Sequence, residues 1–235
     1  MARDAGESGG PNELIVGPYW VSFASDDEDR TDEYRLRYKV FVEEYGFESA
    51  DRCPDGLERD EFDGAACSML LRDAATGELA ACQRLILPER LPQGTLTNLE
   101  HQYASLAGHP SVDFTALPRD SWAEASRTTI AKRYRWGGSA ASMPAMMAIK
   151  FASIALATAF NRPRLFSLSE PPTARLIRRM GFLMVQIGAP VEFHGRRAPF
   201  SMDVDAMAQS VHDDEQVLLD NLVHGAREWR KQWLR

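Results

Sequence analysis

Residues 121–135 combine side chains that seldom occur together on one strand. Small, aromatic and β-branched residues fill positions 122–130 without Gly or Pro, which predicts a strand. The same stretch carries Glu124, Ser126 and Arg127, and charged side chains are rarely buried without a partner. An acid, a hydroxyl and a guanidinium on a rigid strand indicate polar chemistry, with Glu124 as the base.

Charged residues in apolar sequence contexts recur along the chain: they are Arg37, Asp60, Asp63, Arg84, Glu124 and Arg127. An unpaired buried charge costs several kcal/mol, so we expect these three cations and three acids to pair at one end of the sheet. Two interpretations stay open. The set is either an ion-pair lattice that fixes loops or a polar wall for a small charged substrate.

The side-chain alternation of a strand sets a condition on this site. Glu124 and Ser126 share one face of a regular strand, and Arg127 lies on the other. Only a β-bulge brings Glu124 and Arg127 to the same cleft, and a bulge also frees backbone N–H groups. Such groups can hold the oxyanion of an acyl transfer, so a bulge within residues 122–130 is a hypothesis that the sequence itself leaves open.

Length and composition fit one soluble globular domain. The chain has 235 residues, of which 44% are hydrophobic and 26% charged, enough for a sizeable core. The net charge of −7 argues against wholesale nucleic-acid binding, whereas local basic clusters at 127–135, 175–179 and 196–197 suit an acidic partner. No apolar run is long enough for a transmembrane segment and no signal peptide is evident, so we expect a cytoplasmic protein. Three widely spaced cysteines indicate reduced thiols and give no metal site.

Hydrophobic periodicity and turn residues predict a mixed α/β order of elements. Strands are expected at 19–24, 67–72, 79–87, 122–130, 164–168, 182–187, 191–193 and 200–204. Helices are expected from the acidic run 26–32 to Gly46, and at 98–106, 142–160, 173–180 and from 205 onward. The last helix presents an apolar stripe for the domain body or for a dimer. Residues 1–13 form a flexible lead-in, and 14–235 form one domain.

Two weaker patterns deserve mention. Residues 135–140 fit R-x-x-G-x-A before a helix, where backbone amides can cradle phosphate, although a plain glycine turn is the commoner explanation. Among five scattered histidines, His194 lies beside Arg196 and Arg197, and a turn position accounts for it.

Several motifs together resemble one enzyme group. These are 34–47 (YRLRYKVFVEEYGF), Asp60-x-x-Asp63, 84–88 (RLILP) and 123–127 (AEASR), in the order seen in acyl-homoserine-lactone autoinducer synthases. They resemble still more the N-acyl amino acid synthases and the acyltransferases associated with PEP-CTERM/exosortase systems, the latter also through 192–199 (EFHGRRAP). Residues 173–182 resemble the helix–Gly–Phe motif of the GNAT superfamily. The resemblance covers nearly all of residues 19–204.

The resemblance implies a GNAT-like single α/β domain. Its central mixed, splayed β-sheet would be flanked by helices, and an acyl chain and pantetheine arm would lie between strands four and five; the chain adds a C-terminal helix. Glu124 would deprotonate an amine, through water, for direct attack on a thioester, with Arg127 beside it. The implied substrate-lining residues are Arg37, Phe41, Phe47, Asp60, Asp63, Arg84 and Ser126. The basic residues expected to meet an acyl carrier protein and its phosphopantetheine are Lys132, Arg133, Arg135, Arg175, Arg178 and Arg179.

Departures from the autoinducer synthases guide the choice of acceptor. Phe47 replaces a usual tryptophan, Ala125 replaces a branched apolar residue, and residues 89–120 and the tail beyond 205 are longer. We therefore expect an N-acyltransferase that moves a fatty acyl group from acyl carrier protein to an amino acid amine. Acyl-CoA is the alternative donor, and no bound cofactor is expected. The alternatives are an acyl-homoserine-lactone synthase using S-adenosylmethionine and a non-catalytic lipid or acyl-carrier binding module.

Overall fold

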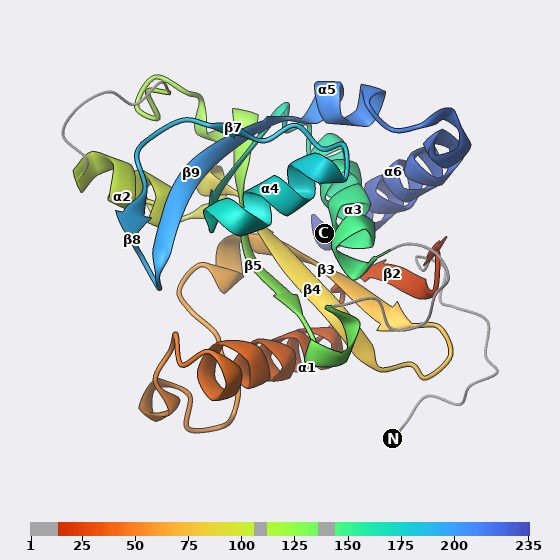
Figure 1. Cartoon of the computed structure of the whole chain (residues 1–235), viewed down its shortest axis with the longest axis horizontal. Coiled ribbons are helices and arrows are strands. Elements are labelled where there is room, and N and C mark those ends of the chain that lie inside the picture. Colours follow the sequence, from red (N-terminus) through yellow and green to blue (C-terminus); the bar gives the residue numbers. More distant parts are fainter. Residues whose placement is uncertain (1–13, 106–111, 136–143) are drawn as a thin grey trace.

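A large mixed sheet runs through the protein (Figure 1), whose computed structural model describes residues 14–105, 112–135 and 144–235. Within these residues the strand order is β1-β2-β3-β4-β5-β6-β9-β7, and β8 pairs with β9. The strands are β1 (Leu14–Val16), β2 (Tyr19–Phe23), β3 (Ala66–Asp73), β4 (Leu79–Ile86), β5 (Trp122–Ile130), β6 (Arg164–Ser169), β7 (Val185–Gln186), β8 (Val191–Glu192) and β9 (Arg196–Asp203). The helices are α1 (Asp27–Arg37), α2 (Asn98–Ser105), α3 (Ala145–Ala159), α4 (Pro171–Arg179), α5 (Val204–Gln209) and α6 (Asp213–Trp233).

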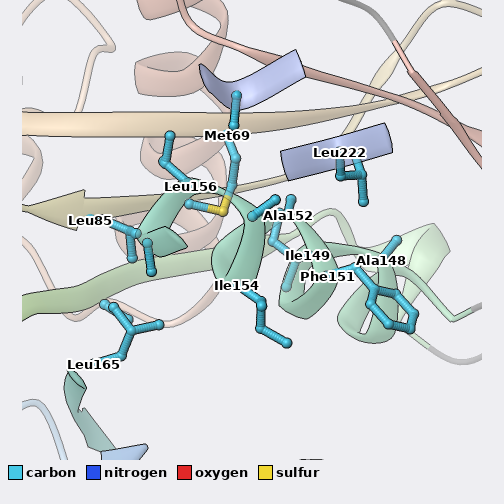
Figure 2. Packing of buried hydrophobic residues seen from close by; sticks show 14 of the residues in the cluster. Met69, Leu85, Ala148, Ile149, Phe151, Ala152, Ile154, Leu156, Leu165 and Leu222 are labelled. Carbon is cyan, nitrogen blue, oxygen red and sulfur yellow. The ribbon is translucent and has the colours of Figure 1, made fainter. Parts of the chain in front are cut away.

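Side-chain alternation on β3 decides which helix covers which face. Met69 and Leu71 join the main core with α3, whereas Leu70 joins a second cluster with Leu36 and Val40 at the α1 side. Figure 1 shows α1 on one side of the sheet and α3 with α6 on the other. Figure 2 shows the α3 side, where Leu156, Ala152 and Ile149 of the helix lie close to Met69 of β3. The sheet is therefore rigidly held on both faces.

The sheet splays where its two central strands run parallel. β5 and β6 pair only over Trp122–Glu124 and Arg164–Phe166, and beyond these residues the strands separate. This geometry confirms the expected GNAT-like architecture with a mixed, splayed sheet. The expected strands four and five are β5 and β6, because Leu14–Val16 adds a strand that the sequence pattern did not predict.

The bulge that the sequence left as a hypothesis is present on β5. Cys82 pairs with Thr129 and Arg84 pairs with Ser126. Between these two pairs β5 has two residues and β4 has one, so β5 contains one extra residue. Arg127 lies at this point with φ of +50°, a left-handed conformation that a non-glycine residue adopts only at some cost.

The other differences from the expected elements are local. The helix expected to run to Gly46 is α-helical only to Arg37 and continues as a π-helix over Tyr38–Glu44. The expected strand 182–187 is reduced to Val185–Gln186. The helix expected from 205 onward is two helices. Asp203 caps the start of α5, and residues 210–212 are not helical and separate α5 from α6. The lead-in 1–13, the 142 cap and most of the glycine pattern 135–140 lie outside the described residues.

The additional C-terminal helix α6 packs on α3. Leu222, Ala226 and Trp229 are fully buried there, and the Trp229 ring lies 5.5 Å from that of Phe23. The apolar stripe thus packs on the domain body rather than remaining free for a dimer. Within the three described ranges, no helix combines the length and apolar character needed to cross a membrane.

Candidate active site

A cavity of about 320 Å³ opens where β5 and β6 separate. Its volume lies at the lower end of the range for small-molecule sites. One wall comes from β5 and the segment after α1, and the opposite wall from β6, α4 and the β8–β9 turn. The residues that line the cavity include Phe41, Phe47, Glu48, Gln83, Ala125, Ser126, Arg127, Thr128, Arg135, Lys150, Ser167, Ser169, Glu170, His194 and Arg197.

Apolar side chains from α3, α4 and the segments next to them give the cavity a fatty lining. Met146 comes from α3, Leu176 and Ile177 come from α4, and Leu168 and Met184 complete this part of the wall. Ile177 and Met184 are almost fully buried. An acyl chain bound against these residues would be removed from water, and no polar group of the protein would lose a partner.

Arg127 lies in the cavity wall and contacts three carboxylates. Its guanidinium lies 3.2 Å from Glu48, 3.0 Å from Glu58 and 3.0 Å from Asp60, and it stands over the ring of Phe41. The bulge aims this side chain toward the carboxylates of the segment 48–60 rather than toward Glu124. Arg127 is therefore held in one orientation at the edge of the cavity.

The predicted pairing of Arg37, Arg84, Asp60 and Asp63 occurs behind this edge. Arg37 lies 2.7 Å from Asp63, and Arg84 lies 2.6 Å from Asp60 and 2.5 Å from Asp63. Burial alone would raise the pKa of Asp60, but its hydrogen bonds and ion pair with Arg84 lower it to about 2. Both arginines are fully buried and none of the four lines the cavity. Their placement favours the ion-pair lattice, which supports the cavity wall through Arg84 Nε and the Ser126 hydroxyl, 2.9 Å apart.

Glu124 lies beside the cavity but does not line it. Its side chain is 2% exposed and accepts a hydrogen bond from the backbone N–H of Leu99 at 3.1 Å, with a second from the Thr97 hydroxyl. Burial raises the pKa of this carboxyl, and the hydrogen bonds only partly offset the effect. The next residue, Ala125, does line the cavity. The bulge therefore leaves Glu124 and Arg127 with different surroundings, contrary to the expected shared cleft.

An aromatic and basic cluster lies next to Arg127 in the cavity lining. Phe41 and Phe47 both line it, and the Arg197 guanidinium lies 5.4 Å from the centre of the Phe47 ring. His194 has φ of +48° at the β8–β9 turn, and its Nε2 lies 3.5 Å from Glu48. The expected turn position is confirmed, and the same turn brings His194 and Arg197 to the cavity.

The six basic residues expected to meet an acyl carrier do not act as one group. Arg135 lines the cavity and lies 2.7 Å from Glu44, whereas Lys132 and Arg133 are exposed outside it. The remaining three are exposed residues of α4, a helix that contributes other residues to the wall: Arg175, Arg178 and Arg179.

Sequence reasoning missed several polar residues of the wall. Lys150 was visible as a lone charge in an apolar helix, and this signal was as strong as that of Arg37 or Arg84. Glu48 and Glu58 gave no comparable signal because they lie in a polar loop, where carboxylates are common.

Residues 36–145 match the acetyltransferase (GNAT) domain. The structure of TofI, in a ternary complex with an inhibitor and MTA, is 26% identical, covers 80% of this chain and 92% of its own, and has a TM-score of 0.59. BjaI, a CoA-dependent acyl-homoserine lactone synthase, is 16% identical, covering 92% and 100%, with a TM-score of 0.57. FeeM, an N-acyl amino acid synthase from uncultured soil microbes, is 12% identical, covering 83% and 95%, with a TM-score of 0.55. No curated protein sequence matches the chain.

The matched domain and the splayed sheet define the class of protein. The chain is an acyltransferase of the GNAT type, with a cavity at the separation of β5 and β6. Its fold is shared by synthases that make acyl-homoserine lactones and by one that makes N-acyl amino acids.

Proposed function

We propose that this protein is an N-acyltransferase that moves a fatty acyl group from an acyl carrier protein thioester to the amine of an amino acid. The observation that carries the proposal is the cavity between β5 and β6, which combines a fatty lining with a cationic wall. The fatty part suits the acyl chain. The cations suit the carboxylate that distinguishes an amino acid from a simple amine.

The transfer needs one direct displacement. The amine nitrogen attacks the thioester carbonyl carbon, a C–N bond forms, and the C–S bond breaks. The proton lost by the amine passes through water to Glu124, and the same proton is then returned through water to the departing thiolate, which leaves as the thiol. Burial of Glu124 supports this role because a carboxylate with a raised pKa is a stronger base.

A covalent acyl-cysteine finds little support in the described part of the chain. Cys53, Cys67 and Cys82 are all buried, and burial raises the pKa of each thiol. Thiols in such surroundings are poor nucleophiles. Direct transfer is therefore the simpler route.

The proposal also includes the acyl donor, the subgroup of acyltransferases and the cellular location of the protein. The exposed arginines of α4 beside the cavity support an acidic carrier protein, and acyl-CoA is the alternative donor. The PEP-CTERM/exosortase-associated subgroup is supported by the sequence resemblance of the segment 192–199, which also supplies His194 and Arg197 to the cavity. The cytoplasmic location expected from the sequence belongs to the proposal as well.

A lactone synthase using S-adenosylmethionine is the second candidate. It is favoured by the likeness to TofI, which is 26% identical and has been solved with MTA. Incubation of the purified protein with acyl-carrier thioester or acyl-CoA, and with either an amino acid pool or S-adenosylmethionine, separates the candidates by product mass. We expect acyl amino acids. Acyl-homoserine lactone alone would overturn the choice of acceptor, and binding of the acyl carrier without any product would identify a binding module.

A further inference from the structure

Lys150 is a buried cation in the wall of the cavity. It lies in the second turn of α3, its residue is 6% exposed, and it contributes to the cavity lining beside Met146. The rest of α3 is apolar or small, so packing alone does not require an ammonium here. Among the described residues, no carboxylate lies within 4.0 Å of its Nζ.

The neutral polar residues that line the cavity with Lys150 do not neutralise it. Gln83 donates a hydrogen bond to the Thr128 hydroxyl and accepts one from Ser153, so its amide is already bonded at both ends. Ser167 and Ser169 pair with each other at 3.1 Å on β6. These groups carry no charge, and most of their hydrogen-bonding atoms already have partners within the protein.

The three other fixed cations of the wall differ from Lys150 in this respect. Arg127 contacts three carboxylates, Arg135 lies 2.7 Å from Glu44, and Arg197 lies 3.9 Å from Glu170. An anionic ligand would have to compete with these protein carboxylates. At Lys150 it would meet an unpaired charge.

We propose that Lys150 is the anion-binding residue of the substrate cavity and that its ligand is a substrate carboxylate. A buried charge is stable only when it is paired, and an ammonium facing an open cavity can be paired by the ligand itself. Burial lowers the pKa of Lys150 to about 8, so the group is still mostly charged at neutral pH and able to bind an anion.

Two substrate parts can bring this carboxylate. If the proposed function holds, the amino acid acceptor supplies its α-carboxylate, and Lys150 then selects amino acids over simple amines. A dicarboxylic acyl group would instead supply a carboxylate at the far end of the chain. Both sources require the same ammonium, and kinetics with matched substrates distinguish them.

A binding experiment tests the site without requiring turnover. Calorimetry compares N-dodecanoylglycine with its primary amide, which differs only at the carboxylate, on the wild type and on Lys150→Met. We expect the wild type to bind the acid about tenfold or more tightly than the amide, and Lys150→Met to bind the two alike. Lys231→Met, at an exposed position of α6, is the matched control and should keep the acid preference.

Circular dichroism and thermal unfolding establish that Lys150→Met is folded before binding is compared. Amide bound as tightly as acid by the wild type would overturn the proposal. So would an acid preference that survives in folded Lys150→Met.

Turnover measurements assign the source of the carboxylate. A rise in KM of about tenfold for the amino acid but not for its amide, in Lys150→Met, assigns Lys150 to the acceptor. The same loss confined to an adipoyl thioester, relative to a hexanoyl thioester, assigns it to the acyl chain. Absence of turnover with every acceptor contradicts the proposed function, whereas the calorimetric comparison still decides whether Lys150 binds a carboxylate.

Discussion

Glu124 and Arg127 lie three residues apart on β5, yet their side chains have different partners. Glu124 accepts hydrogen bonds from the segment 97–99, and Arg127 contacts Glu48, Glu58 and Asp60 across the strand. The bulge between the Arg84 and Cys82 pairs separates the two environments. The candidate base and the candidate positioning cation thus approach the cavity from different sides.

Replacement of Glu124 by Gln tests the general base. The amide keeps the shape and can still accept the hydrogen bond from Leu99, but it cannot take a proton. We expect the rate of acyl transfer to fall about 10²–10⁴-fold and the acidic limb of the pH–rate profile to disappear. Rates from single-turnover mass spectrometry give both results.

Glu100→Gln is the matched control for the base. Glu100 is also buried and accepts a hydrogen bond from the Thr97 backbone N–H at 2.7 Å, but the proposed transfer does not use it. If both variants lose activity equally with unchanged pH profiles, Glu124 serves the structure of the 95–100 segment and not the chemistry.

Arg84→Met tests the ion-pair lattice. The substitution leaves Asp60 and Asp63 without one of their buried cations, and breaking a buried pair in this way costs about 3–5 kcal/mol of unfolding free energy. Urea denaturation at neutral pH measures the loss. Arg59→Met removes an exposed pair with Asp55 and should change stability by no more than about 1 kcal/mol. Equal effects of the two substitutions would contradict the lattice.

The acid limb of stability should depend on Asp60. Its folded pKa of about 2 lies below the usual aspartate value of 3.8, so its stabilising contribution is present above about pH 4 and is lost as the pH falls through 2. This pKa shift corresponds to about 2 kcal/mol of unfolding free energy. Denaturation of the wild type and Asp60→Asn between pH 5 and 2 should show a shallower decline in the variant. Parallel curves would contradict this assignment.

Lys150 should make the ligand-free protein less stable at neutral pH. Its folded pKa of about 8 lies below the usual lysine value of 10.5, so the unfolded chain binds more protons between these two pH values. The wild type therefore gains stability as the pH rises from about 8 to 10.5. At pH 7 we expect Lys150→Met to be more stable by up to about 3 kcal/mol, a difference that shrinks toward pH 10.

Denaturation at pH 7 and pH 10 measures this difference, with Lys231→Met as the exposed control. A Lys150→Met difference that is the same at both pH values would show that the ammonium is not buried in a low-dielectric site. The acid preference in calorimetry should also weaken above pH 8, as Lys150 loses its proton.

Local sequence patterns were sufficient to predict most of the fold. Two strand-like runs on either side of the turn 73–77 predicted the hairpin of β3 and β4, and the continuous apolar run of α3 predicted a helix buried against a sheet. Both features depend on residues that are close together in the sequence. The break between α5 and α6 was missed because residues 210–212 contain neither Gly nor Pro to mark it.

The sequence also identified which charges must pair, but not which of them reach the cavity. Burial cost forces Arg37 and Arg84 to find carboxylates wherever the chain folds, so their pairing was predictable from residue types. Access to the cavity depends on one extra residue in β5 and on the separation of β5 from β6, and both are decided by strand pairing across distant segments. For this reason Glu124, singled out first from the sequence, lies behind the wall, while Lys150 lies within it.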